Sequence, residues 1–214
     1  MNSAHIGIIP FTYFGGYNKS AGSTFLRIDG LIANSSDFEI WRHGYSYDGL
    51  IFQKAYWKEM MELFCGPKIL DLCDMDWISG DIDIIEVGNL VDAISCSSPK
   101  LTHLLKGYFP KKIVVHVPDR LNFKIFPADR RAHIGKAKHV VWFGYIQNAY
   151  QTLPQLAEII ARNQLKLTII SDQPYMQDDA IHELKPIFIK YEKETAYQLI
   201  QQADMVFNPR VNTA

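Results

Sequence analysis

Short apolar runs alternate with helical patterns along the whole chain. Ten runs rich in β-branched and aromatic residues are predicted to be strands, and most, such as KILDL and KIVVHV, are apolar almost without interruption. Strands of this kind are covered on both faces, which favours a parallel sheet between helices over an antiparallel sheet with one wet face. The predicted strands are His5–Phe11, Phe38–Arg42, Leu50–Lys54, Lys68–Leu72, Ala93–Ser97, Ile113–Val117, Val140–Tyr145, Lys166–Ser171, Ile187–Tyr191 and Met205–Asn208.

Four segments between these strands place apolar residues at positions i, i+3, i+4 and i+7, which lie on one face of a helix. Ser98 followed by Pro99 suits the cap and first position of one of these helices. We interpret the apolar stripes as packing against the sheet. Alternating strands and helices predict an α/β fold of Rossmann-like, doubly wound parallel sheets. The stripes begin at Trp57, Leu101, Leu153 and Ala196.

The domain organisation follows from one break in this pattern. A length of 214 residues permits one large domain, or one domain and part of another. The segment PDRLNFKIFPADRRAHIGKAK is basic, contains two prolines and has no sustained period. We therefore predict a complete N-terminal Rossmann-like domain at 1–118, a linker at 119–138 and a partial C-terminal Rossmann-like domain at 139–214.

Composition narrows the function classes. The 22 Lys and Arg residues nearly balance the 23 Asp and Glu residues, so we do not expect a nucleic-acid partner held by bulk phosphate attraction. No stretch approaches the roughly 18 to 20 apolar residues of a spanning helix, and the N-terminus lacks a basic signal region, which predicts a cytoplasmic protein without a transmembrane segment. Cys65, Cys73 and Cys96 lack metal-ligand spacing and are predicted to be buried free thiols.

Ligands of open α/β sheets bind beyond the carboxyl ends of the strands, so the residues after each strand are the candidates. The first predicted strand leads into a loop with Gly15 and Gly16, and then into a helix start that could face an anion. The loop matches neither the dinucleotide fingerprint nor the P-loop. It is either a place where backbone approaches a substrate or an ordinary glycine turn.

Three carboxylates follow one another closely at the fourth predicted strand. Asp74 and Asp76 come at or beyond its end, where a carboxylate can accept hydrogen bonds from sugar hydroxyls or assist proton transfer. They could equally cap the next helix, and Asp71 could be a satisfied core carboxylate. Their spacing is not a recognised metal loop, and we expect no metal site. His116, in the sixth predicted strand, is a further catalytic candidate or a satisfied core residue.

The second domain offers a weaker signal after its first strand. Gly144 stands at the strand end and Asn148 in the helical segment that follows. Such a turn can hold a diphosphate in principle, although most strand-to-helix turns carry a Gly or an Asn. Both residues are predicted substrate-binding positions.

The order of these segments resembles that of glycosyltransferases with the GT-B fold, of the group 1 or family 4-like kind. In the final segment, Ala203, Asp204 and Pro209 match an L-x-x-A-D-x-x-x-x-P-S stretch, and Val117-Pro118-Asp119-Arg120 stands where the family has an IPNG-type turn. The segments that carry the resemblance are IGIIPFTYFGGYNKSAGSTFLR, VDAISCSSPKLTHLLKGYFPKKIVVHVPD, VVWFGYIQNAYQTLPQLAEII and ETAYQLIQQADMVFNPR.

The resemblance implies two Rossmann-like domains with a cleft between them, the first binding an acceptor and the second a nucleotide-sugar. Gly15 and Gly16 would border the acceptor and the donor phosphates, Asp74 would face the cleft, and Gly144 would lie near the donor diphosphate. It implies no cofactor beyond the nucleotide-sugar, which is a substrate. The expected partners are that nucleotide-sugar and a carbohydrate or lipid-linked acceptor.

Two departures from the family pattern change the expected activity. Tyr145, Gln147 and Asn148 replace the family's basic residues after the glycine, and no glutamate-containing donor motif follows Pro209. We therefore expect a glycosyltransferase-like protein that is truncated in its donor domain and has little catalysis of its own. The alternative is a non-catalytic α/β binding or assembly module that forms a homodimer through an exposed MVFNP edge.

Overall fold

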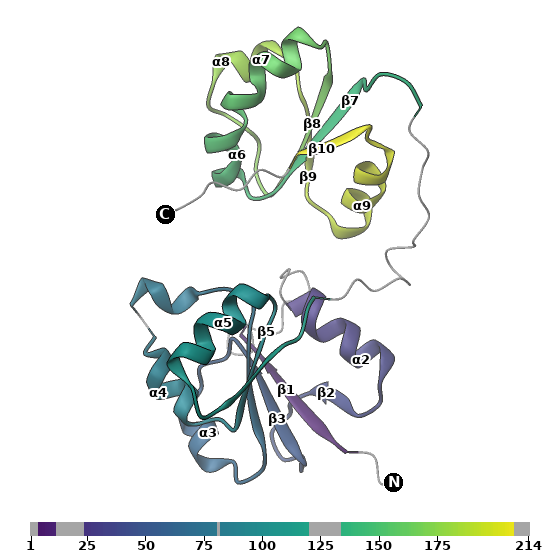
Figure 1. Cartoon of the computed structure of the whole chain (residues 1–214). Coiled ribbons are helices and arrows are strands. Elements are labelled where there is room, and N and C mark those ends of the chain that lie inside the picture. The colour runs from purple at the N-terminus through teal and green to yellow at the C-terminus, as the bar shows by residue number, and fades with distance from the viewer. Residues whose placement is uncertain (1–3, 12–23, 81, 120–133, 208–214) are drawn as a thin grey trace. The chain divides into compact units, whose positions relative to one another are not determined.

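The computed structural model describes residues 4–11, 24–80, 82–119 and 134–207. The chain divides into two compact units, Met1–Ile125 and Phe126–Ala214 (Figure 1). The predicted linker at 119–138 falls largely on residues 120–133, which lie outside the described residues. Within the described ranges, no helix is both long and apolar enough to cross a membrane.

Unit 1 is built on a parallel sheet with the order β2-β1-β3-β4-β5-β6. The predicted parallel α/β fold is therefore confirmed for this unit. The strand order changes direction between β1 and β3, which is where ligands of doubly wound sheets commonly bind, at the carboxyl ends. The strands are β1 Ile6–Pro10, β2 Phe38–Ile40, β3 Gly49–Gln53, β4 Lys68–Leu72, β5 Ala93–Cys96 and β6 Ile113–His116.

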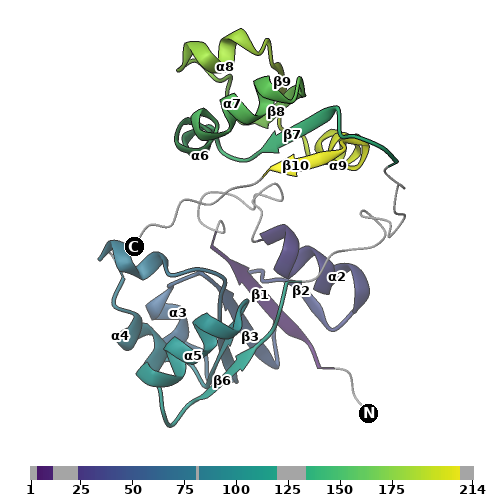
Figure 2. The same cartoon turned by 45° about the horizontal axis from the view of Figure 1, so that its top comes forward.

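Helices lie on both sides of this sheet, and α2 lies on the side opposite α3, α4 and α5 (Figures 1 and 2). Phe52, Leu70 and Ile94 are fully buried in the core that the sheet forms with α3, α4 and α5. Ser98 caps α5 as predicted, because its Oγ accepts a hydrogen bond from the Leu101 amide at 3.2 Å. The helical segments are η2 Phe25–Asp29, α2 Gly30–Asn34, α3 Lys58–Leu63, η3 Asp76–Ser79, α4 Ile84–Asn89 and α5 Pro99–Tyr108.

The α2 side of the same sheet is covered less completely. Successive side chains of a strand point to opposite faces, so the neighbours of the buried residues belong to this second face. Ile51 and Ile69 are only partly buried, and Val115 on β6 is 43% exposed. An apolar sheet face is thus left partly open among the described residues of unit 1.

Unit 2 repeats the architecture on a smaller scale, as a parallel sheet with the order β10-β7-β8-β9. Trp142 and Ile169 are buried with α6, α7 and α8, whereas Val141 and Ile170 are buried with Ala196 of α9, so helices cover both faces. The elements are β7 His139–Phe143, α6 Ile146–Thr152, α7 Pro154–Arg162, β8 Lys166–Ser171, α8 Asp179–Glu183, β9 Ile187–Lys190, α9 Lys193–Gln202 and β10 Met205–Phe207.

Candidate functional site

The carboxyl ends of β3 and β4 carry a cluster of charged side chains. Lys54 follows β3, and its Nζ lies 2.6 Å from Asp74 Oδ1 and 3.4 Å from Asp76 Oδ2. The Tyr56 hydroxyl donates a hydrogen bond to Asp76 Oδ1 at 2.5 Å. The Asp74 side chain is 58% exposed while that of Lys54 is 13% exposed, so the cluster has a largely shielded cation and an accessible carboxylate.

The backbone of Lys54 adopts an unfavourable conformation that the surrounding structure holds in place. Its φ of +50° lies in the left-handed region, which costs a residue other than glycine roughly 1–2 kcal/mol. The Lys54 amide still donates to the Asp71 carbonyl at 2.9 Å. Burial lowers the pKa of the Lys54 ammonium, but Asp74 and Asp76 outweigh that effect and hold the pKa above its ordinary value. Lys54 therefore stays charged at neutral pH.

Aromatic rings stand around the same edge. Lys54 Nζ lies 5.4 Å from the centre of the Phe11 ring, directly after β1. Trp41, after β2, packs edge to face against Trp57 with 5.6 Å between ring centres. Burial and the neighbouring Asp76 raise the pKa of Tyr56, so its hydroxyl remains a hydrogen-bond donor.

Of the three cysteines, Cys96 is buried as predicted, but Cys65 is exposed and Cys73 is half-buried. The prediction of a buried thiol was wrong for Cys65, because α3 ends at Leu63 and Cys65 therefore does not lie on the helix face that packs against the sheet. Burial and then the Asp74 charge raise the pKa of Cys73 to about 12, which leaves its thiol protonated and unsuited to nucleophilic attack at neutral pH.

His116 lies at the end of β6, two strands away from β4 in the sheet. Neighbouring strands are about 4.8 Å apart, so the backbones of His116 and of the Asp74 region are separated by roughly 10 Å. A hydrogen-bonded route joins them: His116 Nε2 lies 3.2 Å from the Ser97 carbonyl, and Ser97 Oγ donates to the Cys73 carbonyl at 3.0 Å. The two predicted catalytic residues share one sheet edge without direct contact.

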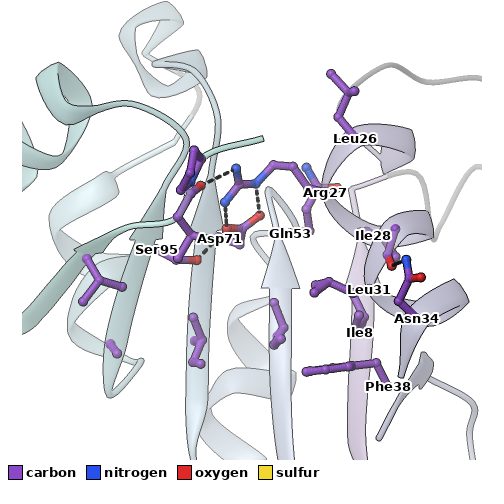
Figure 3. A pocket seen from close by; sticks show the side chains of 17 residues that line it. Ile8, Leu26, Arg27, Ile28, Leu31, Asn34, Phe38, Gln53, Asp71 and Ser95 are labelled. Atoms are coloured by element: carbon purple, nitrogen blue, oxygen red, sulfur yellow. Dashed lines mark hydrogen bonds and ion pairs between the residues drawn. The ribbon is translucent and has the colours of Figure 1, made fainter. Parts of the chain in front are cut away.

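Asp71 has the core role that the sequence left open (Figure 3). It is 6% exposed and receives two hydrogen bonds from Arg27, from Nε at 2.6 Å and from Nη2 at 2.5 Å. Ser95 Oγ donates to the same carboxylate at 2.5 Å. Burial lowers the pKa of Arg27, but Asp71 and Asp119 more than compensate, and the guanidinium stays charged.

In unit 2, Gly144 has φ +155°, and a Cβ there would lie 3.0 Å from the Trp142 ring, which explains the glycine. Asn148 is exposed on α6. The Ile146 amide at the start of α6 donates to Asp172 Oδ1 at 2.9 Å. This bond lowers the pKa of Asp172 and so favours its ionised form. A negatively charged carboxylate therefore already occupies the turn where the sequence suggests a diphosphate.

Comparisons with known proteins find no family. No protein-family model matches the chain, and no curated protein matches its sequence. Among solved structures, a likeness exists to the Glycosylation Associate Protein (Gap123) complex from Streptococcus agalactiae, with a TM-score of 0.42 and 15% identity. The likeness covers 74% of this chain and 37% of that chain, so this chain spans well under half of its length.

Three residues that organise these sites, Lys54, Tyr56 and Arg27, were not predicted from the sequence. Gly15 and Gly16, which were predicted to bind substrate, lie outside the described residues. Lys54 follows β3 directly and Tyr56 comes two residues later, so the rule that ligands bind beyond strand ends would have marked both as candidates, although not as partners of the aspartates. Arg27 gave no signal, because its partner Asp71 is 44 positions away along the chain.

Proposed function

We propose that this protein is a glycosyltransferase-like protein of the GT-B kind, which transfers a sugar from a nucleotide-sugar to a carbohydrate or lipid-linked acceptor. The observation that carries the proposal is the cluster of Lys54, Tyr56, Asp74 and Asp76 at the carboxyl edge of the unit 1 sheet. Carboxylates there accept hydrogen bonds from hydroxyl groups, and the nearby indole rings of Trp41 and Trp57 suit the apolar faces of sugars. This edge is the proposed acceptor site.

In the proposed reaction, an acceptor hydroxyl oxygen forms a bond to C1 of the donor sugar. The bond from C1 to the diphosphate oxygen breaks, and the nucleoside diphosphate leaves with that electron pair. Asp74 takes the hydroxyl proton, and Lys54 holds the carboxylate in place. His116 serves the same edge as a hydrogen-bonding group for the acceptor.

The donor is proposed to bind in unit 2, at the turn that contains Gly144 and at Asn148. Asp172 is the obstacle in this proposal, because its negative charge would repel a diphosphate at the start of α6. A donor diphosphate would have to displace this carboxylate from the Ile146 amide. A protein with this arrangement binds its donor weakly.

Transfer and acceptor binding test the first part of the proposal. The full chain is incubated with a panel of UDP- and GDP-sugars and simple glycoside acceptors, and nucleoside diphosphate release is measured. Loss of a general base typically costs 10²–10⁴ in rate, so Asp74→Asn should lower turnover at least a hundredfold. Glu62→Gln, which changes an exposed carboxylate on α3, is the matched control and should leave turnover unchanged.

Donor binding tests the second part by calorimetry. Asp172→Asn keeps an oxygen that can accept from the Ile146 amide but removes the charge, so it should tighten nucleotide-sugar binding several-fold. Asp178→Asn makes the same change at the start of α8, where Asp178 accepts from the Ala180 amide at 2.8 Å, and should have no effect. No nucleotide-sugar binding by either the parent or the Asp172→Asn variant would contradict the donor assignment.

A second candidate function is assembly without catalysis. β10 is an edge strand of the unit 2 sheet, and Val206 on it is 41% exposed. Edge strands with apolar side chains invite pairing with another chain. A concentration-dependent dimer in sedimentation experiments, abolished by Val206→Lys, together with no sugar transfer, would favour this function.

A further inference from the structure

The α2 side of the unit 1 sheet contains a cavity of about 390 Å³ (Figure 3). Pockets for small molecules commonly measure roughly 300–1,000 Å³, so this one has a suitable size. Its floor is a row of apolar residues in register on four neighbouring strands: Ile8, Ile51, Ile69 and Ala93.

The polarity of the cavity changes two residues further along the strands. Gln53 on β3, Asp71 on β4 and Ser95 on β5 are in register and form a polar row above the apolar one. The Asp71 carboxylate accepts hydrogen bonds from both Ser95 and Arg27, as described above. One end of the cavity is therefore apolar, and the other end presents hydrogen-bonding groups.

Gln53 is the group in this row whose hydrogen bonds are not made. It is 0% exposed, and neither its Nε2 nor its Oε1 has a hydrogen-bond partner among the residues that the structure describes. Leaving a buried carboxamide unpaired costs free energy that a leucine or methionine would not. A group that both donates and accepts hydrogen bonds would satisfy it.

We propose that this cavity binds an uncharged small molecule with an aliphatic body and one polar end, such as a fatty amide or a fatty alcohol. The aliphatic body lies over Ile51, Ile69 and Ala93, and the polar end is hydrogen-bonded to Gln53. An anionic end is excluded because Arg27 is already paired with Asp71 and Asp119, so a buried negative charge on the ligand would find no partner. A neutral end suits Gln53, whose carboxamide both donates and accepts hydrogen bonds. The site does not rest on the proposed sugar transfer.

The cavity also has a way in. Leu31 on α2 and Val117 after β6 line it and are 41% and 45% exposed. These exposed apolar residues form the part of the rim through which an aliphatic ligand can enter from solvent. Parallel sheets are normally covered on both faces, and a bound aliphatic chain would complete the cover here.

The proposal is tested with octanamide and octanoate, which have the same length and differ in charge. Binding to the full chain is measured by ligand-observed NMR and calorimetry at neutral pH. Octanamide should bind at least tenfold more tightly than octanoate, because the carboxylate charge would be desolvated without a partner. Failure of octanamide to bind at millimolar concentration, or tighter binding of octanoate, would overturn the proposal.

Two variants locate the site. Gln53→Met keeps the side-chain volume but removes the amide, so it should weaken octanamide binding about tenfold, while the melting temperature stays equal or rises. Gly30→Leu adds a side chain at the cavity wall, where a Cβ meets nothing within 4 Å, and should abolish binding of both probes. Equal octanamide affinity in the parent protein and both variants would place binding elsewhere and reject the site.

Discussion

At the residue scale, the strongest feature of unit 1 is the buried ion pair between Arg27 and Asp71. Both residues are less than a tenth exposed, and the pair ties η2 to the middle of the sheet. Removing one partner of such a pair leaves a buried charge and typically costs 3–5 kcal/mol, although replacing both partners by apolar residues costs much less. The pair therefore stabilises unit 1 mainly in the sense that losing one partner alone is costly.

This cost gives the first stability prediction. Arg27→Met should lower the free energy of unfolding by about 3 kcal/mol, because the buried Asp71 carboxylate loses its cation and, among the described residues, keeps the Ser95 hydroxyl as its side-chain donor. The double variant Arg27→Met with Asp71→Leu should recover more than half of that loss. Urea unfolding measures both. Lys58→Met, which breaks the exposed pair with Glu86, is the control and should unfold like the parent protein; a loss equal to that of Arg27→Met would contradict the prediction.

Residue identities in the candidate site were only partly accessible from the sequence. Asp74 was predictable because it follows an unmistakable apolar strand and therefore lies at the carboxyl edge. The contact between Asp74 and Lys54 could not be predicted, because it requires β3 to lie beside β4. The order of strands in a sheet is decided by the packing of the whole sheet. The unpaired state of Gln53 could not be foreseen at all, since a glutamine at a strand end is ordinarily exposed.

At the element scale, all ten predicted strands were confirmed, because continuous apolar runs bounded by turns have few other interpretations. The four striped helices were also found, as α3, α5, α7 and α9. The short helices α4 and α8 were missed, since six and five residues cannot show a repeating stripe. Each begins with a capping aspartate, Asp83 and Asp178, whose side chain accepts backbone amide hydrogen bonds. These capping aspartates are the sequence feature that predicts the starts of the two short helices.

Cap energetics can be measured at α5, where the sequence predicted the cap. Ser98→Ala removes the acceptor for the Leu101 amide and should lower the free energy of unfolding by about 1 kcal/mol. Ser98→Asp supplies an alternative acceptor next to the positive end of the helix dipole, so its free energy of unfolding should equal that of the parent protein. Denaturant unfolding of both variants provides the comparison. Equal destabilisation by alanine and aspartate would show that the hydroxyl packs rather than caps.

At the scale of the whole molecule, the two units have separate hydrophobic cores, one around Phe52 and Leu70 and the other around Trp142 and Ile169. Each core is made from the strands and helices of its own unit. Cooperative unfolding follows contiguous cores, so a chain with two cores is expected to depart from a single two-state transition.

Calorimetry of two matched core variants tests this expectation. Leu70→Ala in unit 1 and Ile169→Ala in unit 2 each remove a fully buried aliphatic side chain, which typically costs 2–5 kcal/mol. Each variant should lower one thermal transition and leave the other within a degree of its position in the parent protein. A single transition that both variants shift equally would instead show that the two cores unfold as one cooperative body, and the stability of a ligand site in unit 1 would then depend on substitutions in unit 2.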